Sequence, residues 1–195
     1  MAVAISGRGP DIIWKPVRHR MAQTTLLSIL QGGDRRSLGQ ANRLVTLILG
    51  QPKRFPELLE CLWCDDPVVR MRAADAAEKI SAQRAELLHP FKAELLGLAG
   101  ETSQQELRWH LALMIPRLPL TPAERKREIA LLKEFLNDRS SIVKTCALQG
   151  LAELAQDNSE IRAEVVGIME QASRTGTPAM KARARKLLPG LRRER

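Results

Sequence analysis

One stretch of the chain decides its fold. It covers residues 62–77 and reads LWCDDPVVRMRAADAA. An aspartate followed by a proline is a strong helix start, because the carboxylate accepts hydrogen bonds from free backbone N–H groups and proline is tolerated in the first turn. Val69, Ala73 and Ala77 then recur every four residues, which places them on one helix face. The stretch therefore predicts a turn followed by a helix with a narrow apolar face.

The same start and stop signals recur along the whole chain. Thr121-Pro122 and Thr177-Pro178 repeat the start, and Ser103 with Glu106 and Thr121 with Glu124 fit the capping-box pattern. No segment alternates like a strand. We expect ten helices, at about 22–31, 34–50, 53–64, 66–81, 84–99, 103–116, 121–137, 140–156, 158–173 and 177–191. Pro116 should end or kink the sixth of them early.

Every second predicted helix begins with a related pattern. An apolar residue is followed by a cation, and small or aliphatic residues come after it at helical spacing. The four cations, named here the cation row, are Arg70, Arg108, Lys144 and Lys181. They are 38, 36 and 37 residues apart, and a weaker copy begins at Ser37. Such a period indicates an internal repeat of helix pairs.

This pattern resembles the HEAT-repeat family of armadillo-type helical solenoids. The best copies are residues 62–77 and residues 135–151, each with an acidic turn, a valine-basic pair and a second helix rich in Ala and Leu. The resemblance implies an all-α fold, an α-solenoid of about five HEAT-like helical hairpins in a right-handed superhelix. Its second helices would form a long concave face. The helix contacts are expected to bury Ala77, Leu111, Ile115, Ala147, Leu151 and Leu188.

Composition and charge divide the 195 residues into three parts. Aromatic residues make up 3% of the chain, and no apolar run approaches the roughly 20 residues of a membrane span. Residues 1–20 hold four basic residues and one acidic residue, and residues 174–195 hold eight and one, so most of the net charge of +9 lies at the ends. We expect a flexible basic leader at 1–20, a HEAT-like repeat domain at 21–191 and a basic tail at 192–195. Met21 is an alternative start to Met1.

No catalytic or cofactor chemistry is visible in the sequence. Cys61 and Cys64 form a single CxxC without a histidine partner, and Cys146 stands alone, which favours structural thiols in a reducing cytoplasm. The three histidines lack any metal-binding spacing. The prediction is therefore a cytoplasmic protein that is not an enzyme, has no cofactor or metal and does not enter a membrane.

Two functions remain open on these grounds. The first is a scaffold or adaptor that binds another protein on its concave face. The alternative is a nucleic-acid-binding protein that uses a basic groove for phosphate contacts, as in HEAT-like DNA glycosylases. The candidate binding residues for either function are Arg70, Arg108, Lys144, Lys181, Arg72 and Arg185. An enzyme of the glycosylase type would need a carboxylate beside Trp and Arg, and the nearest set is Asp75, Trp109 and Arg108.

The cation row itself has a structural interpretation and a ligand-binding one. In HEAT repeats, a basic residue at this place commonly pairs with the acidic turn. That resemblance implies a pair between Arg70 and Asp65 or Asp66, and another between Lys144 and Asp138. If the row instead binds a ligand, its members should face an open groove without acidic partners.

Overall fold

The computed structural model describes residues 26–31, 39–156 and 158–192. Within these residues the chain is entirely helical and has no strand, which confirms the all-α prediction. The α-helices are α1 (Leu26–Leu30), α2 (Ala41–Gly50), α3 (Phe55–Glu60), α4 (Pro67–Ser81), α5 (Lys92–Glu101), α6 (Gln105–Met114), α7 (Pro122–Phe135), α8 (Ser141–Ala155), α9 (Ser159–Thr175) and α10 (Pro178–Arg192). The short 3-10 helices are η1 (Pro52–Arg54), η2 (Cys61–Trp63), η3 (Ala85–Phe91) and η4 (Ile115–Arg117).

The predicted start of the second helix is wrong. The sequence pattern placed it at residue 34, whereas α2 starts at Ala41. Gly39 has a φ of +53°, which a continuous α-helix cannot contain. A Cβ atom at Gly39 would also lie 3.1 Å from Cζ of Arg72, so the glycine gives room to that side chain. The position is therefore a turn against α4.

Proline explains most of the other differences at helix boundaries. The predicted helix at 84–99 divides into η3 and α5 beside Pro90, and Pro116 turns the end of α6 into η4, as expected. Thr121 and Glu124 form the predicted capping box. The box predicted at Ser103 and Glu106 is wrong, because the residue that caps α6 is Gln104 and its side chain makes no capping bond.

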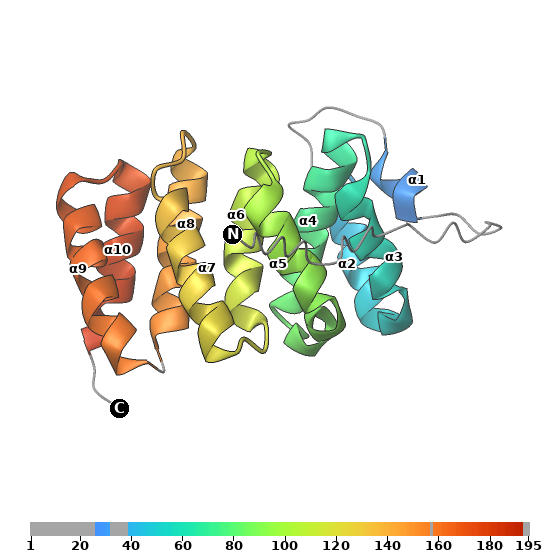
Figure 1. The fold of residues 1–195 in the computed structure, drawn as a ribbon. Helices are drawn as coiled ribbons and strands as arrows, with labels where there is room; N and C mark the ends of the chain where they lie inside the picture. Colours follow the sequence, from blue (N-terminus) through green and yellow to red (C-terminus); the bar gives the residue numbers. More distant parts are fainter. Residues whose placement is uncertain (1–25, 32–38, 157, 193–195) are drawn as a thin grey trace, which may run out of the picture.

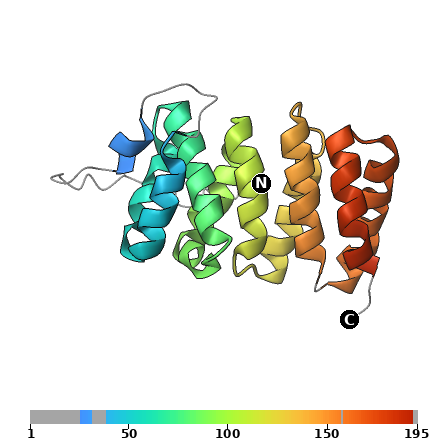
Figure 2. The same ribbon diagram turned by 180° about the vertical axis from the view of Figure 1, so that it is seen from behind.

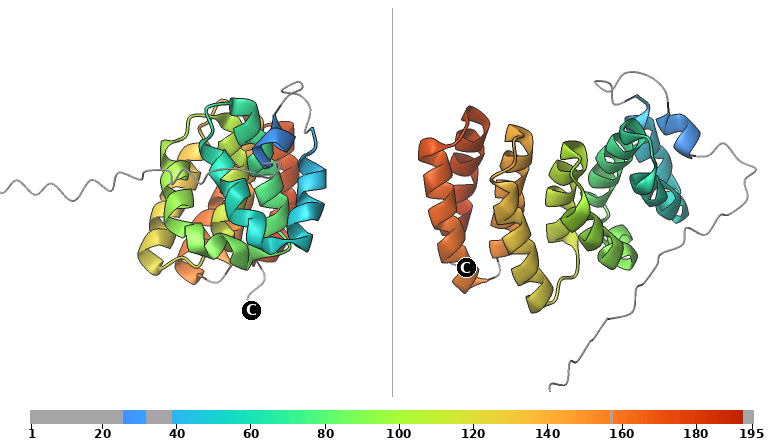
Figure 3. Two further views of the ribbon diagram at one scale, coloured as in Figure 1. Left: turned by 90° about the vertical axis from the view of Figure 1, so that its right-hand side faces the viewer. Right: turned by 45° about the horizontal axis from the view of Figure 1, so that its top comes forward.

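The helices pack as antiparallel pairs in a row. The hairpins are α1–α2, α3–α4, α5–α6, α7–α8 and α9–α10, and each second helix (α2, α4, α6, α8, α10) packs on the second helix of the next hairpin. Figure 1 shows the first helices toward the viewer, and Figure 2 shows the second helices from the opposite side. The right-hand view of Figure 3 shows the hairpins next to one another along a single row. The apolar core runs along the row between the two sets of helices.

All six residues that were predicted to be buried are buried. Helices α6 and α8 approach each other closely at Gly150. A Cβ atom on Gly150 would lie 2.4 Å from the backbone oxygen of Ala112, so only glycine fits there without moving a helix. This contact holds the third and fourth hairpins tightly together.

Both ends of the chain bear on the predicted domain limits. The predicted leader at 1–20 lies outside the described residues, as do residues 193–195. Arg192, placed in the predicted tail, instead belongs to α10, and its Nη2 pairs with Oε1 of Glu170 at 2.6 Å. In the described part of the chain, none of the helices combines the length and apolar composition needed to cross a membrane.

Candidate functional site

The cation row occupies one equivalent place in four second helices. Arg70, Arg108, Lys144 and Lys181 are each the fourth residue of their helix, beside the turn that joins the two helices of a hairpin. Each of the first three side chains therefore lies at a junction between two hairpins. The chemistry differs from one junction to the next.

Arg70 joins the second hairpin to the third. Its Nη1 donates to the backbone oxygens of Cys64, at 2.7 Å, and Asp65, at 3.2 Å. Its Nε donates to Oε1 of Gln104 in the next hairpin at 2.7 Å. Nε2 of Gln104 in turn donates to the backbone oxygen of Pro67 at 2.8 Å. The guanidinium thus binds the turn of its own hairpin and also the turn of the next hairpin.

Arg108 makes the corresponding connection between the third and fourth hairpins with a full charge pair. Its Nε donates to the backbone oxygen of Thr102 at 2.8 Å, and its Nη1 lies 2.7 Å from Oδ2 of Asp138. The guanidinium also lies 5.4 Å from the ring centre of Phe135, within range for a cation–π contact. The side chains of Arg108, Phe135 and Asp138 together fill this junction.

Asp138 is ionised in this setting. Burial of the carboxyl opposes ionisation, but the N–H of Ser140 and the guanidinium of Arg108 donate to it, and the charges of Arg108 and Lys144 add to their effect. The balance lowers the pKa of Asp138 below its usual value. Oδ2 accepts from Arg108, and Oδ1 accepts from the N–H of Ser140.

Both ion pairs implied by the family resemblance are wrong. Arg70 binds the carbonyl of Asp65 and not a carboxylate, because Asp66 uses its Oδ1 to cap the N–H of Val68 at 2.8 Å. Asp138 pairs with Arg108 of the preceding hairpin and not with Lys144. An arginine can reach both its own turn and the next hairpin, since its donors form a wide fork.

Lys144 and Lys181 complete the row but make no side-chain hydrogen bond or ion pair within the described residues. The length of the turn before the cation explains part of the difference. Helix α9 ends at Thr175, six residues before Lys181, whereas α7 ends at Phe135, nine residues before Lys144. The extended turn that brings a carboxylate to Arg108 has no counterpart at Lys144.

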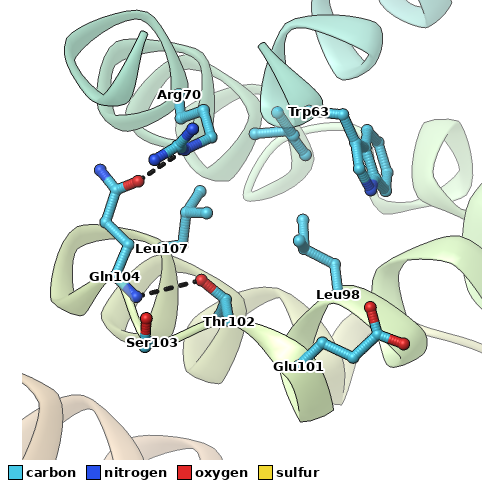
Figure 4. A pocket seen from close by; sticks show the side chains of 9 residues that line it. Trp63, Arg70, Leu98, Glu101, Thr102, Ser103, Gln104 and Leu107 are labelled. Carbon is cyan, nitrogen blue, oxygen red and sulfur yellow. Dashed lines mark hydrogen bonds between the residues drawn. The ribbon is translucent and has the colours of Figure 1, made fainter. Parts of the chain in front are cut away.

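Two pockets lie at junctions of the row. The Trp63 pocket, of about 340 Å³, lies between the second and third hairpins. Figure 4 shows Trp63 and Leu98 on one side of it and the bonded pair of Arg70 and Gln104 on the other. Trp63 is 38% exposed. Glu101 also lines this pocket.

The Lys144 pocket, of about 550 Å³, lies between the fourth and fifth hairpins. Its apolar lining includes Leu148, Ile168 and Met180, and its charged lining is Lys133 and Lys144, without an acidic residue. Lys133 forms an ion pair with Glu164 across the junction. The pocket therefore combines apolar and uncharged polar side chains with two cations, of which Lys144 has no ion-pair partner among the described residues.

The face formed by the second helices carries charges that are paired across the hairpins. Lys79 lies 2.8 Å from Asp75 and donates to Asn42 of α2 at 2.9 Å. Other pairs on or beside this face join η4 to α4 and α10 to α8, through Arg117 with Glu78 and Arg183 with Gln149. Positive and negative groups are thus paired on α4 and between α4 and η4, whereas α10 carries no acidic residue.

The two remaining candidate residues behave differently from each other. Arg72, predicted as part of a basic surface, is 1% exposed, and its Nη1 donates to the backbone oxygen of Leu30 at the end of α1 at 2.7 Å. Assigning it to a binding surface was wrong, because the guanidinium is enclosed by α1 and the turn at Gly39. Arg185 is exposed on α10, as expected, with Lys186 beside it.

His110 is a buried titratable group that the sequence did not single out. It lies on α6, its Nδ1 has no hydrogen-bond partner among the described residues, and its ring meets that of Trp109 edge-on with the ring centres 5.6 Å apart. Burial lowers its pKa to about 4, against the opposing charges of Asp75, Glu78 and Glu106, while Lys79 lowers it further. The imidazole is neutral at pH 7.

The surroundings of the cysteines favour packing over thiol chemistry. Cys61, Cys64 and Cys146 are free thiols. Burial raises the pKa of Cys61 to about 12 and that of Cys146 to about 11, so neither forms a reactive thiolate near neutral pH. Among the residues described, no three His, Cys, Asp or Glu side chains gather as metal ligands.

The glycosylase-like set does not assemble. Asp75 is paired with Lys79 on its own helix, and Arg108 is paired with Asp138 of the following hairpin. Each charged member of the set therefore has another partner.

The sequence interpretation missed the Lys144 pocket, although the repeat contains a signal for it. The residues nine and six positions before the cation are Phe135 and Asp138 in the repeat of Lys144, but Ala172 and Thr175 in the repeat of Lys181.

Comparisons with protein-family models, with curated proteins and with solved structures found no match. The functional proposal below therefore rests on the geometry of the chain itself.

Proposed function

We propose that the chain is a non-catalytic helical-repeat scaffold that binds a partner protein on the face formed by its second helices. In this proposal the row of hairpins is a HEAT-like α-solenoid with a right-handed superhelix, and the second helices line its concave face. Packing between successive second helices and the near-constant spacing of the cation row support the repeat architecture.

The observation that carries the proposal is that the cations on or beside α4 and α6 are already engaged. Lys79 pairs with Asp75, Arg117 pairs with Glu78, and Arg70 and Arg108 are bound within the junctions. A phosphate backbone needs a continuous row of free cations. A mixed surface of paired charges and half-buried apolar side chains is typical of protein interfaces.

A second candidate, nucleic-acid binding, is favoured by α10 alone. That helix carries Lys181, Arg183, Arg185, Lys186 and Arg192 and no acidic residue. Arg183 and Arg192 already bind Gln149 and Glu170, which leaves three cations for an anionic partner at this end of the row. Three phosphate contacts would give weak binding that falls steeply with salt.

Three free thiols support a reducing compartment, and we propose the cytoplasm as the place where the scaffold acts. Both buried thiols with raised pKa would resist oxidation there and elsewhere. No cofactor enters the proposal.

The test places a photoreactive benzophenone side chain at Gln149 on α8 or, as a control, at the exposed Ala130 on α7. The full chain is irradiated in native lysate, with and without nuclease treatment. We expect a protein adduct from the Gln149 position and none from Ala130. An adduct from Ala130 alone would contradict the proposed face, and an adduct from Gln149 that disappears with nuclease would favour the second candidate.

A further inference from the structure

The junction between the third and fourth hairpins shows what fills the space beside a member of the cation row. Phe135 and Asp138, nine and six residues before Lys144, come from the fourth hairpin and meet Arg108 of the third. The ring lies under the guanidinium and the carboxylate pairs with it. The chain thus supplies an apolar group and an anion, three residues apart, to one of its own cations.

The next junction lacks both groups. The residues nine and six positions before Lys181 are Ala172 and Thr175. Alanine has no ring and threonine has no carboxylate, and both residues line the Lys144 pocket. The pocket of about 550 Å³ therefore lies where the preceding junction holds Phe135 and Asp138.

What remains at this junction is Lys144 in a lining of apolar and uncharged polar side chains, with Lys133 already paired to Glu164. Lys144 has no ion-pair partner within the described residues, although its charge contributes to the low pKa of Asp138, whose Oδ2 pairs with Arg108. Leu148 and Ile168 supply apolar surface, and no acidic side chain lines the pocket. A cation beside apolar surface attracts a carboxylate more strongly than one in open water, because the local dielectric constant is lower.

We propose that the Lys144 pocket binds a segment of a partner protein that carries a carboxylate and a bulky apolar side chain three residues apart. The carboxylate pairs with Lys144 as Asp138 pairs with Arg108, and the apolar side chain enters the space that Phe135 fills in the preceding junction. The inference deepens the proposed function and rests on it for the nature of the partner.

The Trp63 pocket does not share this chemistry, although its junction also has small residues at the same two places, Ala99 and Thr102. There the cation Arg70 already donates to Gln104 and to two backbone oxygens. Glu101 adds a negative charge to the lining. The charge of Glu101 would repel a carboxylate in that pocket.

The probe is a fluorescein-labelled peptide with the sequence of residues 129–140, IALLKEFLNDRS, which carries the Phe135 and Asp138 pattern. Binding to the full chain is measured by fluorescence anisotropy. We expect the dissociation constant to rise with salt, because an ion pair is screened. Peptides with Asp138→Asn or with Phe135→Ala should each bind about tenfold more weakly.

Two protein variants test the pocket itself. Lys144→Met keeps the length of the side chain and removes its charge, and Thr175→Asp places a competing carboxylate at the pocket. Each should weaken peptide binding about tenfold. The matched control is Lys126→Met, which removes an equal charge from an exposed site on α7 outside the pocket, and it should bind like the wild type. Circular dichroism verifies that each variant is folded.

Three results would overturn the inference. They are equal binding by Lys144→Met and Lys126→Met, equal binding of the Asp138→Asn peptide, and loss of binding in Lys144→Met to a labelled DNA duplex but not to the peptide. If the benzophenone adduct at Gln149 persists in Lys144→Met while peptide binding is unaffected, the scaffold function stands and the pocket assignment fails. Peptide binding that depends on Lys144, without any Gln149 adduct, supports the pocket and contradicts the proposed face.

Discussion

Two neighbouring junctions between hairpins in this chain are packed differently. Between the third and fourth hairpins, Arg108, Phe135 and Asp138 fill the space, and α6 approaches α8 at Gly150. Between the fourth and fifth hairpins, Lys144 faces small residues and a pocket remains. The repeat period is nearly the same at both places, so side-chain identity and the length of the turn before the cation decide which junction is closed.

The largest expected effect comes from Gly150 in the closed junction. Gly150→Val would place a Cβ atom against the backbone oxygen of Ala112, which cannot move independently of α6. We expect a loss of about 3 kcal/mol in the free energy of unfolding, measured by urea denaturation. Gly167→Val on α9 is the control, since nothing lies within 4 Å of that position, and it should change stability by less than about 0.5 kcal/mol. Equal losses would contradict the tight contact.

The second effect tests the charge pair that closes the junction. Arg108→Met leaves the carboxylate of Asp138, whose side chain is 5% exposed, without its cation. The expected loss is about 2 to 3 kcal/mol in the free energy of unfolding, because a buried charge loses its hydrogen-bonded partner. A loss below about 0.5 kcal/mol in urea denaturation would show that the pair does not hold the hairpins together.

Acid should weaken the junction between the second and third hairpins, where α4 meets α6, through protonation of His110. Its folded pKa of about 4 lies below the ordinary value of 6.5, so the unfolded chain binds the proton first as the pH falls. Stability contributed by the neutral imidazole is complete above about pH 6.5 and declines toward pH 4. Between pH 7 and pH 5 this group should cost about 1 to 2 kcal/mol.

The measurement for His110 is the urea midpoint at both pH values. A variant with His110→Leu should lose less stability over this interval than the wild type. The equivalent position in α8 is Cys146, whose thiol, with a pKa of about 11, stays neutral throughout and provides the contrast. An unchanged pH dependence in the variant would place the acid sensitivity elsewhere.

The smallest effect is expected in the open junction. Lys144→Met removes a cation that has no acidic partner in the described part of the chain, so the free energy of unfolding should change by less than about 0.5 kcal/mol. Urea denaturation alongside Arg108→Met makes the comparison direct. A loss as large as that of Arg108→Met would show that Lys144 is structural and that the two junctions are equivalent.

Much of the fold follows from local patterns in the sequence. Asp66 before Pro67 and Thr121 before Pro122 start helices where expected, and Ala77 and Leu151 are buried as their spacing predicted. These features depend on residues within one or two helical turns, which is why the sequence is sufficient for them. The helix predicted to start at residue 34 failed because Gly39 adopts a turn beside Arg72, a residue 33 positions away.

The sequence by itself determined that the chain is a row of helical hairpins and that one cation recurs in each of four of them. Tertiary structure alone decided what each cation does. Arg108 meets Asp138 of the next hairpin, Arg70 meets Gln104, Arg72 is enclosed by α1, and Lys144 is left beside a pocket. The physical reason is that helix formation depends on neighbours in the chain, whereas an ion pair or a pocket depends on side chains that packing brings together across about 30 residues or more.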